Sequence, residues 1–566
     1  MPTRPTILAL IATCGTLASC SSPFSTSDSD RGMNVGTERL RQVKPLDVSA
    51  MARPSAPAPA TAPASRPEPP PKDPFAGLER VTVTIDQVRA WTLENNLDLK
   101  VVMIDPTIAR TRLTEEEAKF ESTFFANARY NSLDQPTASQ LAGSQVESFD
   151  ADLGVRVPLR TGGTATVELP VNRTKTDNQF STLNPSVDTD ARFSISQPLL
   201  RGGWREANTH SIRIAALDAQ ITQARTNLEV IRQLAEAERA YWRFYAFREA
   251  LTVTQTQYEL AKEQLERAER RVKSGAAPDI EVTRAESGLA QRLEAIIQAE
   301  NNLKQAQRAL KRTLNVNNTG VDSAAAIEPG TPPSPVDLAL DPPALADGAV
   351  RDRMEMLELE LRLAQDVSSV RFAENQALPS FLVDYAYNFN GLGQNFSEST
   401  TQLRGGDFAD WTVGARFETP IGNMAARSRV QQAIITRLQR LATREARVLQ
   451  IRQEVFNAVD SISAGWQRIL ATRQSTILAG RTLDAEQRQF DVGLRTSTDV
   501  LNAAANLADA QLAEIRALTE YQIGLIDLSF ATGTLLGQSR VSWEPIDPRL
   551  DPTVPQTNPV APATAP

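Results

Sequence analysis

Several short stretches of the chain alternate strictly between apolar and polar residues. The clearest is SFLVDYAYNFN at residues 380–390, and WTVGARFE at residues 411–418 repeats the pattern. Alternation with a period of two predicts β-strands that have one apolar and one polar face. In the first stretch, the apolar face is predicted to carry Phe381, Val383, Tyr385, Tyr387 and Phe389.

The first half of the chain contains four further candidate strands. They are residues 123–131, 149–157, 164–169 and 191–196. The Gly162-Gly163 pair between the second and the third predicts a hairpin turn. A one-sided apolar strand fits the lipid side of a membrane β-barrel, and equally one side of a soluble sandwich.

Residues 205–274 contain neither Gly nor Pro, which predicts one helix of unusual length. At 1.5 Å per residue, such a helix spans about 100 Å. Apolar residues near its end recur at alternating three- and four-residue spacing, which predicts antiparallel coiled-coil packing. A free-standing coiled-coil rod is an alternative that the helices alone do not exclude. The stripe consists of Leu251, Tyr258, Ala261, Leu265, Ala268 and Val272, and a second stripe contains Val500, Ala503, Tyr521 and Leu528.

Two places where long helices end are similar in sequence. Residues 271–286, RVKSGAAPDIEVTRAE, align without gaps on the later segment DVGLRTSTDVLNAA when Gly275 is set on Gly493. Glu281 then falls on Asp499. Each glycine is suited to the positive φ that ends a helix, so each segment is predicted to be the tip of a helical hairpin.

Residues at the two tips also predict where the returning helices begin. Pro278 suits the first position of the helix that follows Gly275. Ser497 or Thr498 could cap the helix that follows Gly493.

The chain is predicted to be an internal two-fold repeat. The two halves are residues 81–318 and 343–537, joined by a connector at 319–342. Each half runs from a short helix through strands to a very long helix, a tip and a returning helix. A Pro- and Ala-rich linker precedes them within residues 20–80, and residues 538–566 form a similar tail.

The N-terminus indicates export. Arg4 precedes an apolar run, and LASC at residues 17–20 resembles a bacterial lipobox. Residues 1–19 are therefore predicted to be a signal peptide, with Cys20 acylated and Ser21 favouring the outer membrane. An ordinary secretory signal with a chance cysteine is the alternative. Export favours the membrane interpretation of the strands.

Composition excludes several functional classes. The net charge of −8 over 566 residues is spread without long runs and does not indicate nucleic-acid binding. No apolar run reaches the roughly 18 residues of a membrane helix. His210 is the only histidine, and we expect it simply to be solvated. We therefore expect no catalytic site, metal or other cofactor.

The combination of motifs resembles the TolC-like outer membrane efflux protein family across nearly the whole mature chain. The matching segments, in order, are VTIDQVRAWTLENNLDLK, SISQPLLRGGW, ALPSFLVDYAYNFNG and ETPIGN, together with the two glycine-centred tips. The resemblance implies an α+β membrane protein in which long antiparallel coiled-coil helices form an α-barrel in the periplasm. It also implies a homotrimer that shares one transmembrane β-barrel, to which each chain gives four strands. Six candidate strands are a departure, and the hairpin at residues 155–169 is a candidate insertion.

The same resemblance implies roles for the tips. They form the periplasmic mouth and dock a periplasmic adaptor, and Asp499 takes the first position of an aspartate ring that closes the mouth. Arg495 takes the nearby basic position, and Asn502 replaces the second aspartate. The alternative is that Asp499 only complements a helix N-terminus. The predicted docking residues are Gly275, Ala276, Pro278, Gly493, Leu494 and Thr496.

The expected function is a lipid-anchored, passive exit channel in the outer membrane that extends into the periplasm. It would serve an inner-membrane pump and its adaptor in efflux or in type I secretion. A non-conducting coiled-coil lipoprotein that scaffolds the cell envelope is the alternative.

Overall fold

The computed structural model describes residues 79–137, 143–316 and 319–539, all within one compact unit. The predicted signal peptide, Cys20 and the linker up to residue 78 lie outside the described residues, as does the tail from residue 540. Within the described part of the chain, no helix combines the length and the apolar character needed to cross a membrane.

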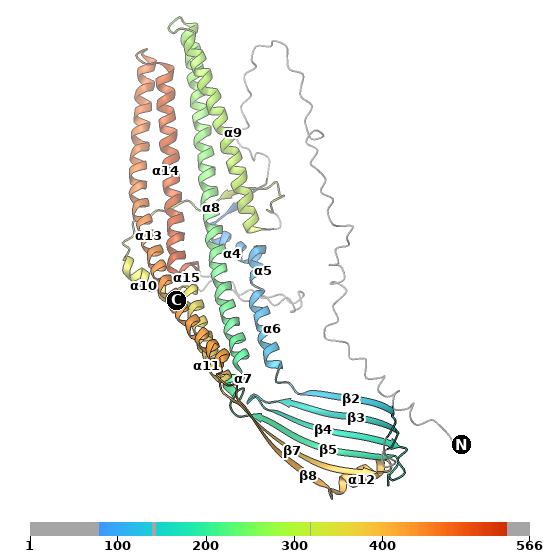
Figure 1. Ribbon diagram of the computed structural model, residues 1–566. Coiled ribbons are helices and arrows are strands. Elements are labelled where there is room, and N and C mark those ends of the chain that lie inside the picture. Colours follow the sequence, from blue (N-terminus) through green and yellow to red (C-terminus); the bar gives the residue numbers. More distant parts are fainter. Residues whose placement is uncertain (1–78, 138–142, 317–318, 540–566) are drawn as a thin grey trace, which may run out of the picture. The chain divides into compact units, whose positions relative to one another are not determined.

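Six antiparallel strands form one sheet in the order β2-β3-β4-β5-β7-β8 (Figure 1). All six predicted strands are confirmed, and each is longer than the sequence pattern suggested. The predicted turn between β3 and β4 is also confirmed, because the Leu159 N–H donates to the Gly163 carbonyl at 2.7 Å and Gly162 has a φ of +91°. The strands are β2 (Thr123–Asp134), β3 (Gln145–Pro158), β4 (Thr164–Thr176), β5 (Ser186–Pro198), β7 (Ser380–Gly393) and β8 (Ala409–Glu418).

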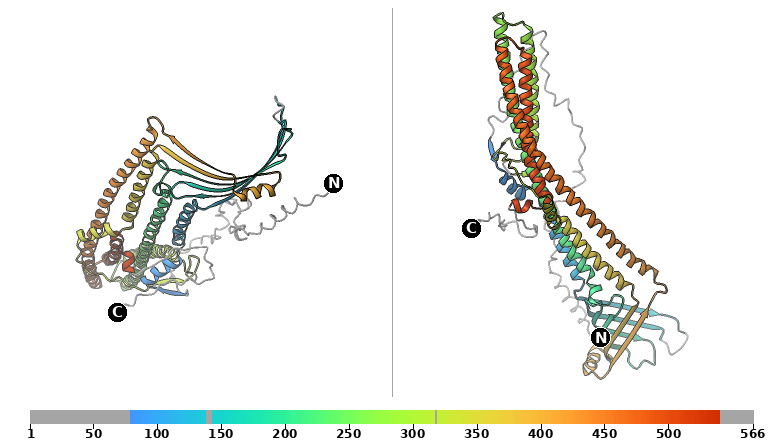
Figure 2. Two further views of the ribbon diagram at one scale, coloured as in Figure 1. Left: turned by 90° about the horizontal axis from the view of Figure 1, so that it is seen from below. Right: turned by 90° about the vertical axis from the view of Figure 1, so that its left-hand side faces the viewer.

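The register places most of the large apolar residues of the six strands on one face, and Phe125 and Leu382 are among the exceptions. Phe193 lies opposite Tyr387, and Phe381 lies opposite Phe417. These side chains remain largely uncovered, with Phe417 61% exposed. A large exposed apolar surface of this kind marks a contact with lipid or with another protein. Figure 2 shows that the sheet is curved rather than flat.

Four long helices form two antiparallel hairpins that run side by side (Figure 2). The helices of the first hairpin are α8 (His210–Lys273) and α9 (Ile280–Leu314), and those of the second are α13 (Met424–Asp491) and α14 (Ser497–Thr532). The predicted stripes lie in the interfaces, with Leu265, Ala268 and Tyr521 at most 2% exposed. Val272 is the exception and is only half-buried.

One prediction about the long helix was wrong. Residues 205–274 do not form a single helix, because Thr209 separates α7 (Arg205–Asn208) from α8. The Asn208 side-chain amide donates to the carbonyls of Gly202 and Trp204, at 2.7 and 2.9 Å. These bonds between a side chain and the backbone compete with the helical ones, as asparagine often does at helix ends.

Most of the shorter elements pack against the long helices, whereas α12 packs on β7 and β5 of the large sheet. β1 (Arg80–Val83) pairs in parallel with β6 (Ala326–Pro329), which lies inside the expected connector. The predicted short helix of the second half is divided at Arg353, which is 5% exposed and forms ion pairs with Glu355 and Glu454. The other helices are α4 (Ile85–Asn95), α5 (Leu97–Val102), α6 (Asp105–Ala118), α10 (Pro342–Asp352), α11 (Met354–Gln376), α12 (Phe396–Gly405) and α15 (Leu535–Ser539).

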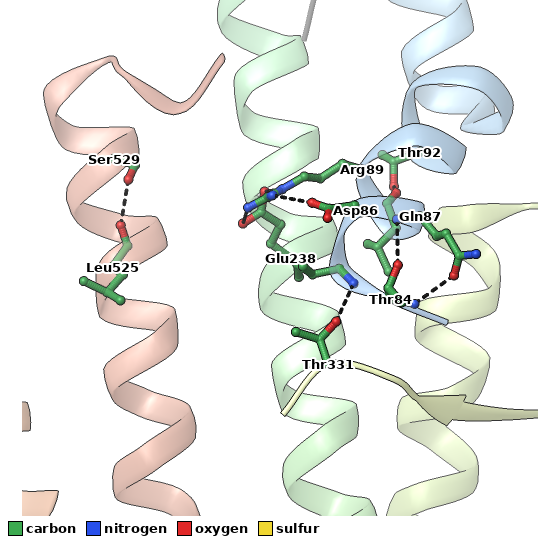
Figure 3. Close-up of polar contacts among 11 residues, drawn as sticks. Thr84, Asp86, Gln87, Arg89, Thr92, Glu238, Thr331, Leu525 and Ser529 are labelled. Atoms are coloured by element: carbon green, nitrogen blue, oxygen red, sulfur yellow. Dashed lines mark hydrogen bonds and ion pairs between the residues drawn. The ribbon is translucent and has the colours of Figure 1, made fainter. Parts of the chain in front are cut away.

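A buried ion pair fastens α4 to α8 (Figure 3). The Arg89 Nε donates to Glu238 Oε1 at 2.6 Å, and Glu238 is only 2% exposed. At the start of α4, Thr84 and Gln87 form a reciprocal capping box, and the Ile85 N–H donates to Thr331 Oγ1 at 3.2 Å. The first short helix is thus tied both to the long helix and to the segment that follows β6.

We expect Arg89→Ala to destabilise the protein by about 3–5 kcal/mol, because it leaves the Glu238 carboxylate buried without a counter-charge. Reversible denaturant unfolding in detergent measures the change. Arg312→Ala is the matched control, since Arg312 and its partner Asp98 are 79% and 69% exposed and such pairs contribute at most about 1 kcal/mol. Equal effects of the two substitutions would contradict a structural role for the buried pair.

Candidate functional site: the hairpin tips

The two hairpin tips share one backbone geometry. Gly275 and Gly493 have φ values of +71° and +81°, so the positive φ expected of both glycines is confirmed. The Ala276 N–H donates to the Arg271 carbonyl five residues back, and the Leu494 N–H donates to the Gln489 carbonyl, each at 2.9 Å. This pattern satisfies the last carbonyls of a helix and reverses the chain.

A capping box opens α14. Thr496 has extended φ and ψ, and its side chain accepts the Asp499 N–H at 3.4 Å. The Asp499 carboxylate in turn accepts the Thr496 N–H at 2.9 Å. The prediction that Ser497 or Thr498 caps this helix was wrong, because both lie inside its first turn.

Asp499 therefore complements a helix N-terminus, which was the alternative to a role in an aspartate ring. Hydrogen bonds from the backbone and the side chain of Thr496 lower the pKa of Asp499, so the carboxylate is ionised at neutral pH. The negative charge is held at the tip by its own helix, whether or not it also acts elsewhere.

The first tip lacks such a cap. α9 begins at Ile280, so Pro278 lies ahead of the first helical position and that prediction was wrong. Asp279 stands at the N-cap without a side-chain hydrogen bond. Glu281, which aligns with Asp499, instead reaches across to the second hairpin.

Glu281 links the two hairpins through Ser497. Its carboxylate accepts the Ser497 N–H at 2.9 Å, and the Gln264 side chain donates to Ser497 Oγ at 3.3 Å. Ser497 is fully buried and Glu281 is 8% exposed. The sequence carried one signal for this contact. Glu281 aligns with Asp499, but Pro278 stands where the second tip has Thr496, so Glu281 has no equivalent capping residue to bond to.

Arg271 forms a second link. Its guanidinium donates to the Phe490 carbonyl at 2.5 Å, and its central carbon lies 4.7 Å from the centre of the Phe490 ring. Phe490 is 3% exposed. No sequence signal distinguished Arg271 from the neighbouring basic residues Arg270 and Lys273. Polar contacts therefore hold the two hairpins together at two places near their tips, at Ser497 and at the Phe490 carbonyl.

The remaining predicted residues lie at the surface. Arg495 pairs with Glu486 of its own hairpin, at 3.2 Å. Asn502 and Ala276 are exposed. Leu494, a predicted docking residue, is 76% exposed, and Val492, which sequence reasoning missed, is 71% exposed. The second tip thus presents an apolar pair of side chains to solvent.

His210 is not simply solvated, so that expectation was wrong. Its ring stacks on Phe372 with the centroids 4.5 Å apart, and its Nδ1 lies 2.9 Å from Ser368 Oγ. Burial, together with the charge of Arg213, lowers the pKa of His210. Across the parts of the chain that the structure describes, no three His, Cys, Asp or Glu side chains converge as metal ligands.

Comparison with known proteins gives consistent matches. The family model described as outer membrane efflux protein matches residues 164–316 and 345–534. The outer membrane protein TolC of Vibrio cholerae is 24% identical over 410 residues, which cover 71% of this chain and 89% of the relative. TolC of Escherichia coli K12 is also 24% identical, over 68% of this chain and 82% of its own length. The solved structure of a Pseudomonas aeruginosa membrane protein superposes with a TM-score of 0.62 at 18% identity, covering 84% of this chain and 99% of that one.

We expect Glu281→Ala to loosen the start of α14, because the buried Ser497 N–H loses a charged acceptor. Such a loss costs about 1–3 kcal/mol, so amide exchange over residues 497–503 should accelerate roughly five-fold to 150-fold. Hydrogen exchange with mass-spectrometric detection measures it.

Asp279→Ala is the control for this exchange experiment, since the Asp279 side chain makes no capping bond. Unchanged protection in the Glu281→Ala variant would show that the contact does not fasten the hairpins.

Proposed function

This chain belongs to the outer membrane efflux protein family, and from that premise we propose that three copies of it form a passive exit channel. It is an outer membrane protein, and the family consists of efflux channels rather than enzymes. The proposed channel receives its substrate from an inner-membrane pump through a periplasmic adaptor, which places the energy source outside this chain. The observation that carries the proposal is a curved sheet with one apolar face and two unpaired edges.

The sheet supports assembly with other copies. Among the residues that the structure describes, its terminal strands, β2 and β8, each have one neighbouring strand. In lipid, an unpaired row of N–H and C=O groups costs several kcal/mol per group, so only a closed sheet is stable there. One chain does not close the sheet, and we propose that neighbouring copies do. The apolar face then meets lipid and the polar face lines a water-filled interior.

The long helices support the same assembly. An apolar stripe on α13 is uncovered in the single chain, and its members lie seven or fourteen residues apart. Heptad spacing of apolar residues is the pattern of a helix that packs against another helix. We propose that this stripe packs on a neighbouring copy, so that the helices of the homotrimer enclose a periplasmic tunnel. Its members are Leu449, Phe456, Leu470 and Ile477, which are 69%, 40%, 48% and 45% exposed.

The tips supply the proposed mouth of the tunnel. Val492 and Leu494 offer an exposed apolar surface for the adaptor. Asp499 carries a fixed negative charge, and three copies around a threefold axis concentrate that potential. The Glu281 and Arg271 links hold the hairpins in one arrangement, and we propose that their release opens the mouth. An acylated Cys20 would add a lipid anchor in the outer membrane.

Single-channel recording in planar bilayers tests the proposal. We expect purified wild-type protein to form channels, and Arg271→Ala to be open roughly ten-fold more often, since it loses a charged hydrogen bond worth about 1.5–3 kcal/mol. Lys273→Ala, an exposed neighbour on the same helix, should behave as the wild type.

Two other outcomes are informative. The absence of channels from every variant would favour the alternative of a non-conducting envelope lipoprotein. Channels whose open fraction does not respond to Arg271→Ala would support conduction and exclude the Arg271 link from gating.

A further inference from the structure

The described sheet has two more strands than the four that the family resemblance implies. The additional pair is the β3–β4 hairpin. It lies inside the sheet rather than at an edge, since β2 pairs with β3 along all of β2 and β4 pairs with β5. The hairpin therefore separates β2 from β5, so the sheet of this chain has six strands where the family resemblance implies four.

The hairpin continues both faces of the sheet. Leu153 lies opposite Leu169, and Val155 lies opposite Val167, on the face that carries Phe193. Between 38% and 48% of each of these side chains is exposed. A hairpin that lay in water outside the membrane would not need apolar residues in line with those of the neighbouring strands.

The polar face continues in the same way. Asp152 and Glu168 of the hairpin lie on the face that carries Arg192 and Asp384. Charged residues on the opposite, apolar face of the hairpin are confined to the end remote from the helices, where Glu147 lies opposite Lys175. The apolar band is thus bounded by charge, as the lipid-facing band of a membrane wall is.

We propose that the β3–β4 hairpin is part of the transmembrane wall, so that each copy supplies six strands and β8 pairs with β2 of the next copy. The proposal rests on the proposed homotrimer. β2 runs away from the helices and β8 runs back toward them, so joining these edges keeps every neighbour antiparallel. Three copies with six strands each make a wall of eighteen strands.

An eighteen-stranded wall has a consequence for the substrate. Barrel diameter grows with strand number, and barrels of roughly 16 to 18 strands enclose a water-filled channel. The hairpin also adds more acidic than basic residues to the polar face. The acids are Asp150, Asp152 and Glu168, and the one basic residue of the hairpin on this face is Arg156. The outer part of the channel is therefore wide and acidic, which suits bulky cationic solutes better than anions.

Cysteine labelling of the full chain in lipid vesicles tests the placement of the hairpin. Leu153→Cys and Leu169→Cys should react with a lipid-soluble maleimide, and their neighbours Asp152→Cys and Glu168→Cys with a membrane-impermeant one. The unsubstituted chain provides the background from its own cysteines. If all four cysteines react with the impermeant reagent alone, the hairpin lies outside the membrane and the proposal fails.

Disulfide cross-linking tests the closure. Val413→Cys on β8 should form an interchain disulfide with Ala126→Cys or Ala128→Cys on β2, which lie on the same face in the continued sheet. The single variants and the pair Val413→Cys/Ile195→Cys, whose second position lies on an inner strand, should form none. Cross-linking of the control pair in place of the β2 pairs would overturn the proposed edge.

These outcomes separate the two proposals. A protein that conducts ions but whose hairpin is not reached from lipid refutes the six-stranded wall and leaves the channel intact. A protein whose hairpin and edges behave as expected but that never conducts refutes the channel and leaves the wall intact. In conducting protein, Asp150→Asn/Asp152→Asn should shift the reversal potential in a salt gradient toward weaker cation preference, and an unchanged potential would refute the acidic lining.

Discussion

Backbone groups that lack a partner at two strand edges impose the constraint on which the rest of this structure depends. β2 and β8 each leave one row of N–H and C=O groups unpaired, and the apolar face between them is too large to remain in water. Lipid accepts that face but not the edges, because nothing in the hydrocarbon replaces water as a hydrogen-bond partner. A single chain therefore leaves the edges of its sheet without partners in lipid, and this is the physical reason for the assembly of neighbouring copies that we propose. In the helical part, the same requirement appears as an uncovered heptad stripe on α13.

The helical part combines tight fastening in the middle with limited fastening at the ends. In the middle of the helical part, the Arg89–Glu238 ion pair and the strand pair β1–β6 fix the short elements against α8. At the tips, the polar contacts of Glu281 and Arg271 join hairpins whose apolar clusters are small and combine alanine with a few larger side chains. Regions held by few apolar contacts open at lower free energy than the core. This distribution is the one that the proposed opening requires, in which the tips move while the sheet and the middle of the helices stay in place.

Sequence patterns predicted every strand of the large sheet and both tips, because these features depend on local periodicity and on the conformational freedom of glycine. The positive φ of Gly275 and Gly493 followed from a comparison of two short segments. The links of Glu281 and Arg271 did not, since each joins residues more than two hundred positions apart and nothing local distinguishes them from solvated charges. The cap at Thr496 was displaced by one residue, because helix starts are the least certain part of a periodic pattern. The break at Thr209 was missed, since it comes from a side chain that bonds to preceding loop carbonyls rather than from Gly or Pro.

The position of the β3–β4 hairpin also bears on how such proteins diversify. When a complete hairpin is inserted between two strands, the strands before and after it keep their directions. The chain therefore still enters the sheet from α6 and still leaves β5 toward α7. Insertion of one strand would reverse everything that follows and break the fold. Evolution can therefore enlarge or reduce the circumference of the proposed barrel in steps of one hairpin per copy. Within a lineage, the width of the proposed barrel can therefore change while the hairpin tips at the other end of the long helices are inherited unaltered.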